Sequence, residues 1–513
     1  MQARAPGLPL HYNTGVLKRV LIANRGEIAC RLIRGCRELG CETVAVYSDP
    51  DARALHVRLA DNACHIGAAA PAESYLNQAK LIDVARAAGC DAVHPGYGFL
   101  AENADFAEAV EAAGLIWIGP PPAAMRGMGL KIEARETARA AGAPVVPGFE
   151  DATASDEAYA QAAKAIGYPV MVKASAGGGG KGMRTVEAPD KLSAALAAAR
   201  RESQSAFGND TVYLEKLLIR PRHIEIQVLA DMHGRVVYLG ERECSIQRRH
   251  QKVVEETPST AVSPALRAEM GAAAVAIARQ VGYVGAGTVE FMLDQAGHYY
   301  FLEMNTRLQV EHPVTEFVYG VDLVHWQLRI ASSELLTLAQ EELRPRGQAI
   351  ECRICADDPA AGFLPAVGRV EVYSEPRGPM VRLDTMLYAG CEVGADYDPL
   401  LGKLIVWAPD RSAAIARMAC ALADHCILGV TTNLPFLYDV ITHPAFAAGA
   451  TDTSFIGQHF PSWAAPPPDV PVQLAAALAL AGRGRAGRPT AAAELDGTAQ
   501  ATPWQSLGRW SNT

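Results

Sequence analysis

Apolar runs typical of buried β-strands alternate with helical stretches through the first 120 residues of the chain. Four such runs lie at 19–24, 43–47, 91–95 and 115–119. This alternation predicts an α/β fold in which a doubly wound parallel sheet opens a ligand crevice at the carboxyl ends of its strands. The turn after the first run, at 24–27, lacks the Gly-x-Gly-x-x-Gly fingerprint, which disfavours a nicotinamide cofactor.

Changes in sequence texture predict three domains and a tail within the 513 residues. We expect an N-terminal α/β domain at 16–130, a small domain with a glycine run at 131–216, and a larger, strand-rich domain at 217–460. Residues 461–513 are rich in proline, alanine and glycine, and we expect them to form a linker towards a further domain. Half of the chain is apolar and a fifth is charged, as in ordinary globular domains.

Charge and cysteine content narrow the class of partner. The net charge is −9 and no long basic run occurs, so we expect no nucleic-acid partner. No apolar stretch reaches the roughly 20 residues of a membrane-spanning helix, so we expect no membrane partner. The first fifteen residues lack the apolar core of a signal peptide. Eleven scattered cysteines favour reduced thiols, and hence a cytoplasmic protein.

A glycine run in the small domain is the first strong chemical signal. Residues 173–184 read Lys-Ala-Ser-Ala-Gly-Gly-Gly-Gly-Lys-Gly-Met-Arg, between two strand-like segments. Four consecutive glycines let backbone N–H groups approach an anion closely, and Lys173 and Lys181 add positive charge. Gly182 stands where a Walker loop has Ser or Thr, and a strand follows rather than a helix. The pattern predicts a mobile lid over a triphosphate; the alternative is a flexible linker.

A predicted hairpin carries two glutamates. Its strand runs are 285–294 and 298–305, and a four-residue loop at 295–298 would pair Asp294 with Tyr299 and set Glu290 opposite Glu303. Carboxylates so close repel each other unless they share a cation or a proton. With Asn305 two residues further along the same face, these oxygen ligands suit a Mg²⁺ ion that bridges ATP phosphates. The alternative is a solvated hairpin face.

Polar residues continue at every second position from Glu303 to Glu311, which places them on one face of an extended chain. A straight strand would spread them over about 26 Å, too far for one small site, so we expect a bend after Asn305. Arg307 would then bind a small oxyanion, with Glu311 beside it as a base. An edge strand with one wet face is the alternative.

Two further clusters are weaker signals. Glu215-Lys216 precedes Pro221-Arg-His223, and the segment 247–252 is basic. Each cluster is either a solvated turn or part of a triphosphate pocket. Cys352-x-x-Cys355 lies in an alternating strand at 349–356 with no second cysteine pair nearby, so we expect neither zinc binding nor redox chemistry there.

Together these segments resemble the biotin carboxylase component of biotin-dependent carboxylases, which are ATP-grasp ligases. The resemblance spans about residues 17–460 and implies a three-part ATP-grasp architecture: a doubly wound N-terminal domain, a small glycine-loop lid domain and a large α+β C-terminal domain. It rests on long segments in the family's order, at 18–29, 94–103, 173–184, 247–256 and 303–316.

The resemblance implies that ATP and bicarbonate form carboxyphosphate, which carboxylates N1′ of carrier-bound biotin. The residues implied for ATP are Lys131, Lys173, Gly178, Gly179, Glu215, Lys216, Leu218, His223, Gln247 and His250. Those implied for Mg²⁺ or Mn²⁺ are Glu290, Glu303 and Asn305. Those implied for bicarbonate and biotin are Lys252, Arg307, Gln309, Val310, the base Glu311, Arg353 at the biotin enolate, and Tyr97 lining the pocket.

The resemblance also implies partners. The biotin-bearing Met-Lys-Met segment is absent from the sequence, so we expect a biotin carboxyl carrier domain and a carboxyltransferase subunit outside these residues, and a homodimer of this domain. The segments 431–436, 453–456 and 501–510 are similar to acyl-CoA carboxylase α subunits, especially methylcrotonyl- or geranyl-type enzymes. We therefore expect the N-terminal part of a longer α subunit. Leu130 stands where the family commonly has Asp.

Three alternatives remain open. The chain could belong to a pyruvate- or acetyl-CoA-type carboxylase instead. It could be another ATP-grasp ligase, making carbamoyl phosphate or an amide, which would share the metal carboxylates without the combination of Arg307, Glu311 and Arg353. It could also be a non-catalytic scaffold subunit that positions a carrier. Turnover that needs both bicarbonate and biotin would exclude the other ATP-grasp ligase, and absence of ATP turnover would support the scaffold subunit.

Overall fold

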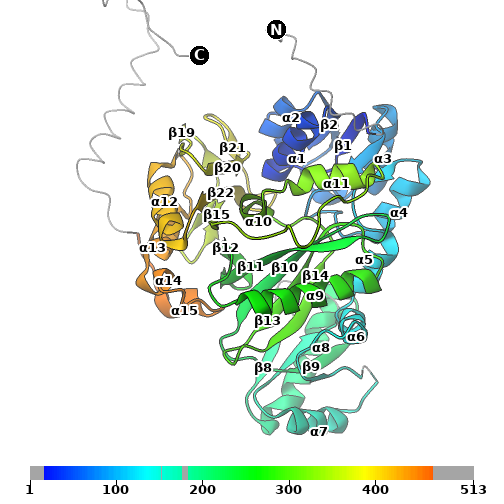
Figure 1. The fold of residues 1–513 in the computed structure, drawn as a ribbon, viewed down its shortest axis with the longest axis vertical. Coiled ribbons are helices and arrows are strands. Elements are labelled where there is room, and N and C mark those ends of the chain that lie inside the picture. Colours follow the sequence, from blue (N-terminus) through cyan, green and yellow to red (C-terminus); the bar gives the residue numbers. More distant parts are fainter. Residues whose placement is uncertain (1–16, 152, 176–182, 466–513) are drawn as a thin grey trace, which may run out of the picture. The chain divides into compact units, whose positions relative to one another are not determined.

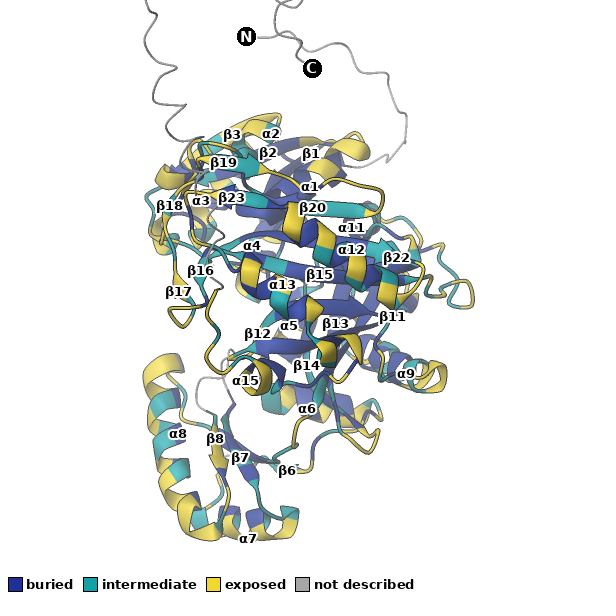
Figure 2. Cartoon of the chain, turned by 90° about the vertical axis from the view of Figure 1, so that its left-hand side faces the viewer, coloured by how far each residue is buried: buried dark blue, intermediate teal, exposed yellow. Residues whose placement is uncertain are grey.

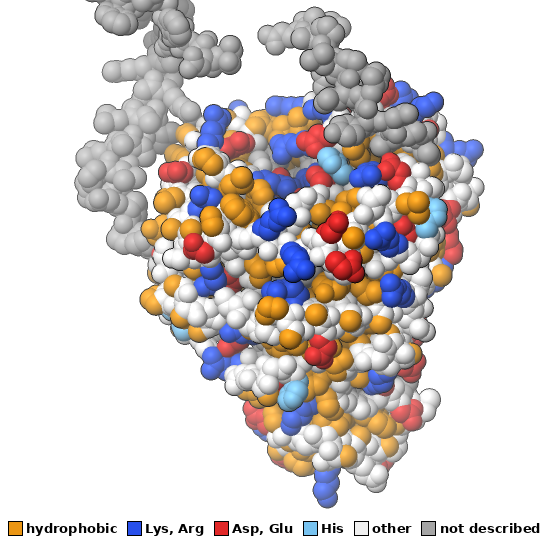
Figure 3. Space-filling view, in the orientation of Figure 1, with side chains coloured by type: hydrophobic (Ala, Val, Ile, Leu, Met, Phe, Trp, Pro, Cys, Tyr) orange, Lys and Arg blue, Asp and Glu red, His pale blue; other side chains and the backbone are white. Residues whose placement is uncertain are grey.

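The computed structural model describes residues 17–151, 153–175 and 183–465, and every helix and strand named below belongs to one compact unit that ends at Trp463. Its three larger sheets are seen as separate groups of arrows in Figure 1. Within the described ranges, no helix is long and apolar enough to cross a membrane. On the face drawn in Figure 3, basic and acidic side chains both occur across the surface.

The N-terminal sheet has five parallel strands in the order β3-β2-β1-β4-β5, which confirms the predicted doubly wound sheet. The sequence does not predict β3, because this edge strand has few buried residues and so lacks a continuous apolar run. The strands are β1 (Arg19–Ile22), β2 (Glu42–Ser48), β3 (Asn62–Gly67), β4 (Ala92–His94) and β5 (Ile116–Trp117). The helices of this region are α1 (Gly26–Glu38), α2 (Leu55–Leu59), α3 (Gln78–Ala87), α4 (Ala104–Ala112) and α5 (Pro122–Gly129), with short η1 (Asp49–Asp51) and η2 (Pro71–Glu73).

A small antiparallel sheet follows, in the order β6-β9-β7-β8. Its strands are β6 (Gly148–Phe149), β7 (Val170–Ala174), β8 (Arg184–Val186) and β9 (Val212–Lys216), and its helices are α7 (Asp156–Ile166), α8 (Leu192–Phe207) and the short η3 (Pro189–Lys191). The pairing of β7 with β8 confirms the predicted strands on either side of the glycine run. Gly178 and Gly179 of that run lie outside the described residues.

An eight-stranded sheet in the order β14-β13-β10-β11-β12-β15-β22-β20 forms the largest layer. Its strands are β10 (Arg222–Ala230), β11 (Val236–Arg248), β12 (Gln251–Thr257), β13 (Gly285–Leu293), β14 (Tyr299–Asn305), β15 (Gln348–Cys355), β20 (Val381–Thr385) and β22 (Leu400–Ala408). The remaining helices are α6 (Lys131–Ala140), α9 (Pro264–Gln280), α10 (His312–Tyr319), α11 (Leu323–Ala331), α12 (Arg411–Asp424), α13 (Leu434–Thr442), α14 (Pro444–Ala447) and α15 (Phe455–His459). Shorter strands pair two by two, namely β16 (Asp357–Asp358) with β17 (Leu364–Pro365), β18 (Gly368–Arg369) with β21 (Glu392–Val393), and β19 (Val372–Ser374) with β23 (Cys426–Leu428).

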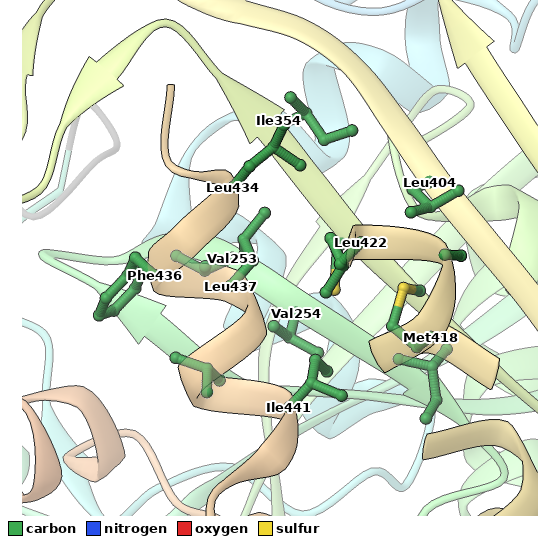
Figure 4. Close-up of a cluster of buried hydrophobic side chains, with 14 of the residues drawn as sticks. Val253, Val254, Ile354, Leu404, Met418, Leu422, Leu434, Phe436, Leu437 and Ile441 are labelled. Carbon is green, nitrogen blue, oxygen red and sulfur yellow. The ribbon is translucent and has the colours of Figure 1, made fainter. Parts of the chain in front are cut away.

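Helices α12 and α13 cover one face of this sheet. In the close-up of Figure 4, Met418 of α12 and Leu437 and Ile441 of α13 lie against Val254 of β12. Each such side chain contributes about 1.5–3 kcal/mol on burial. The central strands of the large sheet are therefore covered on one face by these two helices, and Figure 2 shows these strands largely buried. Helices α7 and α8, in contrast, have exposed outer faces.

The predicted carboxylate hairpin forms, with one correction. Glu290 lies opposite Glu303 as predicted, but Tyr299 pairs with Leu293, so the predicted pairing with Asp294 is wrong. Asp294 instead belongs to the turn, where its side chain accepts hydrogen bonds from backbone N–H groups. The observed register near the turn differs by one residue from the predicted register. This difference is removed at an irregularity next to Glu290, where Phe291 pairs with Phe301, Glu290 pairs with Glu303, and Leu302 has no partner in the register. Such a bulge restores the register that places both glutamates side by side.

A buried carboxylate ties distant parts of the chain together. Glu316 of α10 accepts hydrogen bonds from Arg31 of α1 at 3.0 Å and from Arg382 of β20 at 2.7 Å. It also accepts the backbone N–H of Leu323 at 2.8 Å. Burial alone would raise the pKa of Glu316, but the two arginines outweigh it and lower the pKa to about 2.

We predict that Glu316→Gln destabilises this unit by roughly 3 kcal/mol, because it leaves the buried Arg31 and the partly buried Arg382 without their shared partner. In the wild type the unfolded state binds the extra proton, so the stabilisation by Glu316 is lost as pH falls from about 4.5 to about 2. Urea denaturation at several pH values measures both effects. Over that pH range, Glu316→Gln should lose less stability than the wild type. The control is Glu334→Gln, at a half-exposed pair with Arg329, which should lose as much stability as the wild type. If the free energy of unfolding of Glu316→Gln fell with pH in parallel with that of the wild type, the assignment would be contradicted.

Candidate active site

Three glutamates lie in a row across neighbouring strands of the large sheet. Glu225 of β10 is opposite Glu290 of β13, and Glu290 is opposite Glu303 of β14. Directly opposed residues in antiparallel strands have Cβ atoms about 4.5–5.5 Å apart. Glu225 and Glu290 are also almost completely buried. Such a row of acids is unstable by itself and requires cations close by.

Lys252 of β12 supplies one of these cations. Its ammonium group donates to Glu225 at 2.5 Å, to Glu290 at 2.9 Å and to Glu311 at 2.6 Å. Burial alone would lower the pKa of Lys252, but the three carboxylates outweigh it and hold the pKa well above its usual value. Lys252 therefore stays charged and joins the acidic row to the segment after β14.

The two hairpin carboxylates titrate differently. Burial would raise the pKa of Glu290, but Lys252 and His223 hold it well below its ordinary value. Burial, followed by repulsion from Glu290, raises the pKa of Glu303 instead. Opposed acids with pKa values moved in opposite directions are the arrangement expected where a cation or a proton is shared.

The side chains around this pair suit a hard divalent cation. The Nε2 atom of His223 lies 2.9 Å from Glu290, and ligand atoms of His223, Glu225 and Glu290 all fall within 4.8 Å of one another. Asn305 donates to Glu290 at 2.8 Å. Since carboxylate and amide oxygens predominate here, the donor set fits Mg²⁺ or Mn²⁺ better than a softer metal.

The chain bends where the sequence predicts it. Strand β14 ends at Asn305, and the polar residues that follow leave the strand before α10 begins at His312. Glu311 then lies between two cations, Lys252 at 2.6 Å and Arg353 of β15 at 2.8 Å. Burial would raise the pKa of Glu311, but these cations outweigh it and hold the pKa well below its usual range. Glu311 is therefore an ionised carboxylate able to accept a proton.

Arg307 and Gln309 link the two halves of the site. Arg307 donates to Glu102 at 2.9 Å and to Asn305 at 2.8 Å. Gln309 donates to Glu290 at 2.9 Å, while its side-chain oxygen accepts from the fully buried Arg242 at 2.6 Å. The predicted metal half and anion half are thus connected by hydrogen bonds.

Basic side chains from several elements gather beside Glu303. Burial lowers the pKa of His250, and Lys173, His223 and Lys131 lower it further. The pKa of Lys131 is lowered by burial first, although Glu303 opposes the effect. Basic side chains close enough to lower the pKa of His250 in this way suit a polyphosphate ligand.

The remaining residues implied for ATP surround this group. Lys173 forms an ion pair with Glu215, whose other oxygen is bound by Arg135. Lys216 donates to the backbone carbonyls of Gly167 and Tyr168, at 2.7 Å and 3.1 Å. Gln247 of β11 lies 3.4 Å from the ring nitrogen of His223. Leu218 is half-buried and lies in the segment between β9 and β10.

Tyr97 follows β4 and approaches the site from the N-terminal sheet. Its hydroxyl donates a short hydrogen bond to Glu27 of α1. Its ring centroid lies 5.8 Å from the ammonium nitrogen of Lys403 on β22. Arg353, also implied for biotin, is held by Glu255 at 2.6 Å as well as by Glu311.

Sequence reasoning missed several residues of this network. The strand 222–230 shows a signal that could have found Glu225, because His223, Glu225 and Gln227 alternate with apolar residues that are all buried. Glu102 lies inside the segment 94–103 that carries the resemblance, but its position follows no pattern in the sequence that would mark it as a site residue.

Cys352 is buried, and neither it nor Cys355 joins a cluster of potential metal ligands among the described residues.

A nucleotide-dependent ligase of the ATP-grasp class is the kind of protein that this fold and this acidic, lysine-rich site define. Three family models match the chain in succession. They are the biotin carboxylase N-terminal domain at residues 16–125, the ATP-binding domain of the carbamoyl-phosphate synthase L chain at 131–339, and the biotin carboxylase C-terminal domain at 351–458.

Whole-chain comparisons agree with these matches. The chain is 52% identical to a biotin carboxylase of Nostoc over 85% of its own length and 98% of the relative's. It is 49% identical to the mouse mitochondrial methylcrotonoyl-CoA carboxylase subunit alpha over 87% of its length, but spans only 62% of that subunit. The chain belongs to the biotin carboxylase family of ATP-dependent ligases.

A solved structure agrees as well. The biotin carboxylase domain dimer of the 2-oxoglutarate carboxylase from Hydrogenobacter thermophilus, in complex with MgADP, ADP and bicarbonate, matches with a TM-score of 0.83 and 46% identity. The match covers 86% of this chain and 98% of that chain.

We predict that Glu303→Gln raises the thermal midpoint of the metal-free protein by about 2 °C, because it removes repulsion from Glu290. The same change should abolish the further rise that Mn²⁺ with ADP produces in the wild type, because binding to the folded state is what stabilises it. Thermal scans with and without MnADP measure both effects, with the exposed Glu392→Gln as control. A variant that kept the full MnADP shift would contradict a role for Glu303 in holding the metal.

Proposed function

We propose that this chain catalyses the first half-reaction of a biotin-dependent carboxylase, in which ATP and bicarbonate carboxylate N1′ of carrier-bound biotin through carboxyphosphate. The observation that carries the proposal is the position of Glu311, ion-paired with Lys252 and Arg353 and joined through Lys252 to Glu290 of the acidic row. One site thus offers a base, anion-binding cations and a metal-type carboxylate pair within a connected network.

The nucleotide would lie between the small sheet and the acidic row. We assign its phosphates to Lys131, Lys173, Gly178, Gly179, His223, Gln247 and His250, and its adenine to Glu215, Lys216 and Leu218. Glu290, Glu303 and Asn305 would hold Mg²⁺ or Mn²⁺, which supplies neutralisation of phosphate charge. The gathered basic side chains beside Glu303 support this assignment.

Bicarbonate would be held by Lys252, Arg307, Gln309 and Val310. The Glu311 carboxylate would accept its proton, and the bicarbonate oxygen would attack the γ-phosphorus with ADP as the leaving group. Before substrate enters, Lys252 and Arg353 keep Glu311 ionised but weakly basic. A bicarbonate anion that shares these cations with Glu311 would weaken their hold on its carboxylate charge and so make Glu311 a stronger base.

Carboxylation would follow next to Arg353. Carboxyphosphate breaks down to CO₂ and phosphate, the phosphate takes the N1′ proton of biotin, and the resulting enolate attacks CO₂. The guanidinium of Arg353 would stabilise the enolate oxygen, with Tyr97 lining the biotin pocket. Two fixed acids, Glu255 and Glu311, hold Arg353 in place for this role.

We predict that Glu311→Gln lowers bicarbonate- and biotin-dependent ADP release at least 100-fold, because the amide cannot accept the proton. ADP release with MgATP and bicarbonate, with and without free biotin, measures this, and Glu334→Gln is the matched surface control. Turnover in the wild type that ignores biotin would point to another ATP-grasp chemistry. Absence of turnover despite ATP binding would point to a scaffold subunit.

The acyl acceptor is a finer proposal. We propose that this chain works with a biotin carboxyl carrier domain and a carboxyltransferase subunit of a methylcrotonyl- or geranyl-type acyl-CoA carboxylase, and that this domain forms a homodimer. The similarity to the mouse methylcrotonoyl-CoA subunit supports the first part, and the dimeric structural relative supports the second. The cytoplasmic location stays a prediction.

We predict that labelled bicarbonate is fixed into methylcrotonyl-CoA or geranyl-CoA when the chain is combined with a biotin carboxyl carrier domain and a carboxyltransferase subunit of that type. Acetyl-CoA, propionyl-CoA and pyruvate serve as competing acceptors in parallel reactions. Fixation into pyruvate or acetyl-CoA with no fixation into the branched substrates would contradict the acceptor assignment, while leaving the biotin carboxylase assignment intact.

A further inference from the structure

A completely buried lysine lies behind the proposed base. Lys403 of β22 has no exposed surface. In the sheet it is opposite Arg353 of β15 on one side and Asp384 of β20 on the other. Opposed residues share a face of the sheet, so Lys403 stands beside the arginine assigned to biotin. An ammonium group in such a position is costly unless its contacts compensate for lost water.

The closest contact of Lys403 is with the backbone just before Glu311. Its ammonium nitrogen donates to the carbonyl oxygen of Val310 at 2.6 Å. That carbonyl and the N–H of Glu311 belong to one planar peptide unit. Lys403 therefore fixes the peptide from which the Glu311 side chain projects, while Arg353 binds the Glu311 carboxylate at 2.8 Å. Two cations on neighbouring strands thus fix Glu311, Lys403 at its backbone and Arg353 at its carboxylate.

Lys403 also connects the base to the biotin side of the site. Its nitrogen lies 3.5 Å from Glu27 of α1, and the same Glu27 oxygen accepts the hydroxyl of Tyr97. Glu27 is buried, and its pKa is raised by burial to about 7 even though Lys403 opposes this shift. Helix α1 and the loop that carries Tyr97 thus meet β22 of the large sheet at this ammonium group.

The other acids near Lys403 do not offer it a comparable contact. Glu351 of β15 is fully buried, and neither of its carboxylate oxygens has a hydrogen-bond partner among the described residues. Burial raises the pKa of Glu351 well above its usual value, although Lys403 opposes this shift. The carboxylate of Asp384 accepts two hydrogen bonds from the guanidinium group of Arg382, at 2.7 Å and 3.0 Å. The Val310 carbonyl is therefore the closest hydrogen-bond partner of this ammonium group.

We propose that Lys403 is a positioning residue for carboxylation, which holds the Val310–Glu311 peptide towards bicarbonate and, through Glu27, orients Tyr97 at the biotin pocket. This inference rests on the proposed function. A purely structural ion pair is the competing explanation, but such a pair would place the ammonium on a carboxylate rather than on a backbone carbonyl of the catalytic segment. Removing one partner of a structural buried pair lowers stability without displacing the reacting groups, so the two explanations predict different kinetics.

The test compares Lys403→Met and Lys403→Gln with the wild type in steady-state ADP release. Lys403→Met should lower kcat about 100-fold and raise the KM for bicarbonate, because a misplacement near 1 Å at a reacting group has effects of this order. The KM for ATP should stay within about twofold, because Lys403 touches none of the groups assigned to the nucleotide. Lys403→Gln keeps an N–H donor for Val310 and should recover at least tenfold of the lost kcat.

Arg411→Met is the matched control. Arg411 also binds a buried acid, Glu256, and also donates to backbone carbonyls, those of Phe446 and Ala447. None of these groups belongs to the proposed site. A structural role for Lys403 would lower the thermal midpoint as Arg411→Met does and leave the KM for bicarbonate unchanged, and that result would overturn the proposal.

Glu27→Gln tests the second part of the proposal, the orientation of Tyr97 through Glu27. It also keeps the proposal testable if the Lys403 variants do not fold. The amide can still accept the Tyr97 hydroxyl but loses its attraction to Lys403, so the KM for biotin should rise severalfold while the KM for bicarbonate changes less than twofold. An unchanged KM for biotin would overturn the link to Tyr97. Wild-type protein without biotin-stimulated turnover would reject the proposed function itself, whereas an active wild type with kinetically silent variants would reject only this inference.

Discussion

The contact of one buried ammonium group with three carboxylates is the interaction on which the rest of this site depends. Lys252 binds Glu225, Glu290 and Glu311 within 2.9 Å. Without it, three buried acids would share only Arg242, His223 and Arg353 as counter-charges, and buried carboxylates that lose a partner are strongly destabilising. With it, Glu290 and Glu311 stay ionised although they are buried, and a cation site and a base share one network.

Sheet topology explains how such a network forms. The strand order β14-β13-β10-β11-β12-β15-β22 brings the hairpin acids, the lysine strand and the strands of Arg353 and Lys403 into one layer. Helices α12 and α13 cover part of one face of this layer with apolar side chains, and the acidic row lies away from them. The segment that carries Arg307 and Glu311 then crosses that face between β14 and α10. Long-range pairing, rather than local sequence, places the reacting groups.

Much of this arrangement could be predicted from the sequence. Alternation of strands and helices predicted the parallel sheet, and period-two spacing predicted both the approach of Glu290 to Glu303 and the bend after Asn305. Periodicity reports which face a residue occupies, but not which strand lies beside it. For that reason the network partners Glu225, Arg242 and Lys403 were missed, although Lys403 is a lone cation in an apolar run. The pairing of Asp294 was wrong because a bulge is invisible to strict alternation.

The central claim is that bicarbonate, activated beside Glu311, attacks the γ-phosphorus of ATP. Turnover of MgATP and free biotin with ¹⁸O-labelled bicarbonate tests this directly, with the isotope content of the released phosphate measured by mass spectrometry. Attack by bicarbonate predicts one ¹⁸O atom in each phosphate formed, because the bridging oxygen of carboxyphosphate stays with phosphorus. Phosphate without the label would mean that water attacks ATP, and would contradict the account.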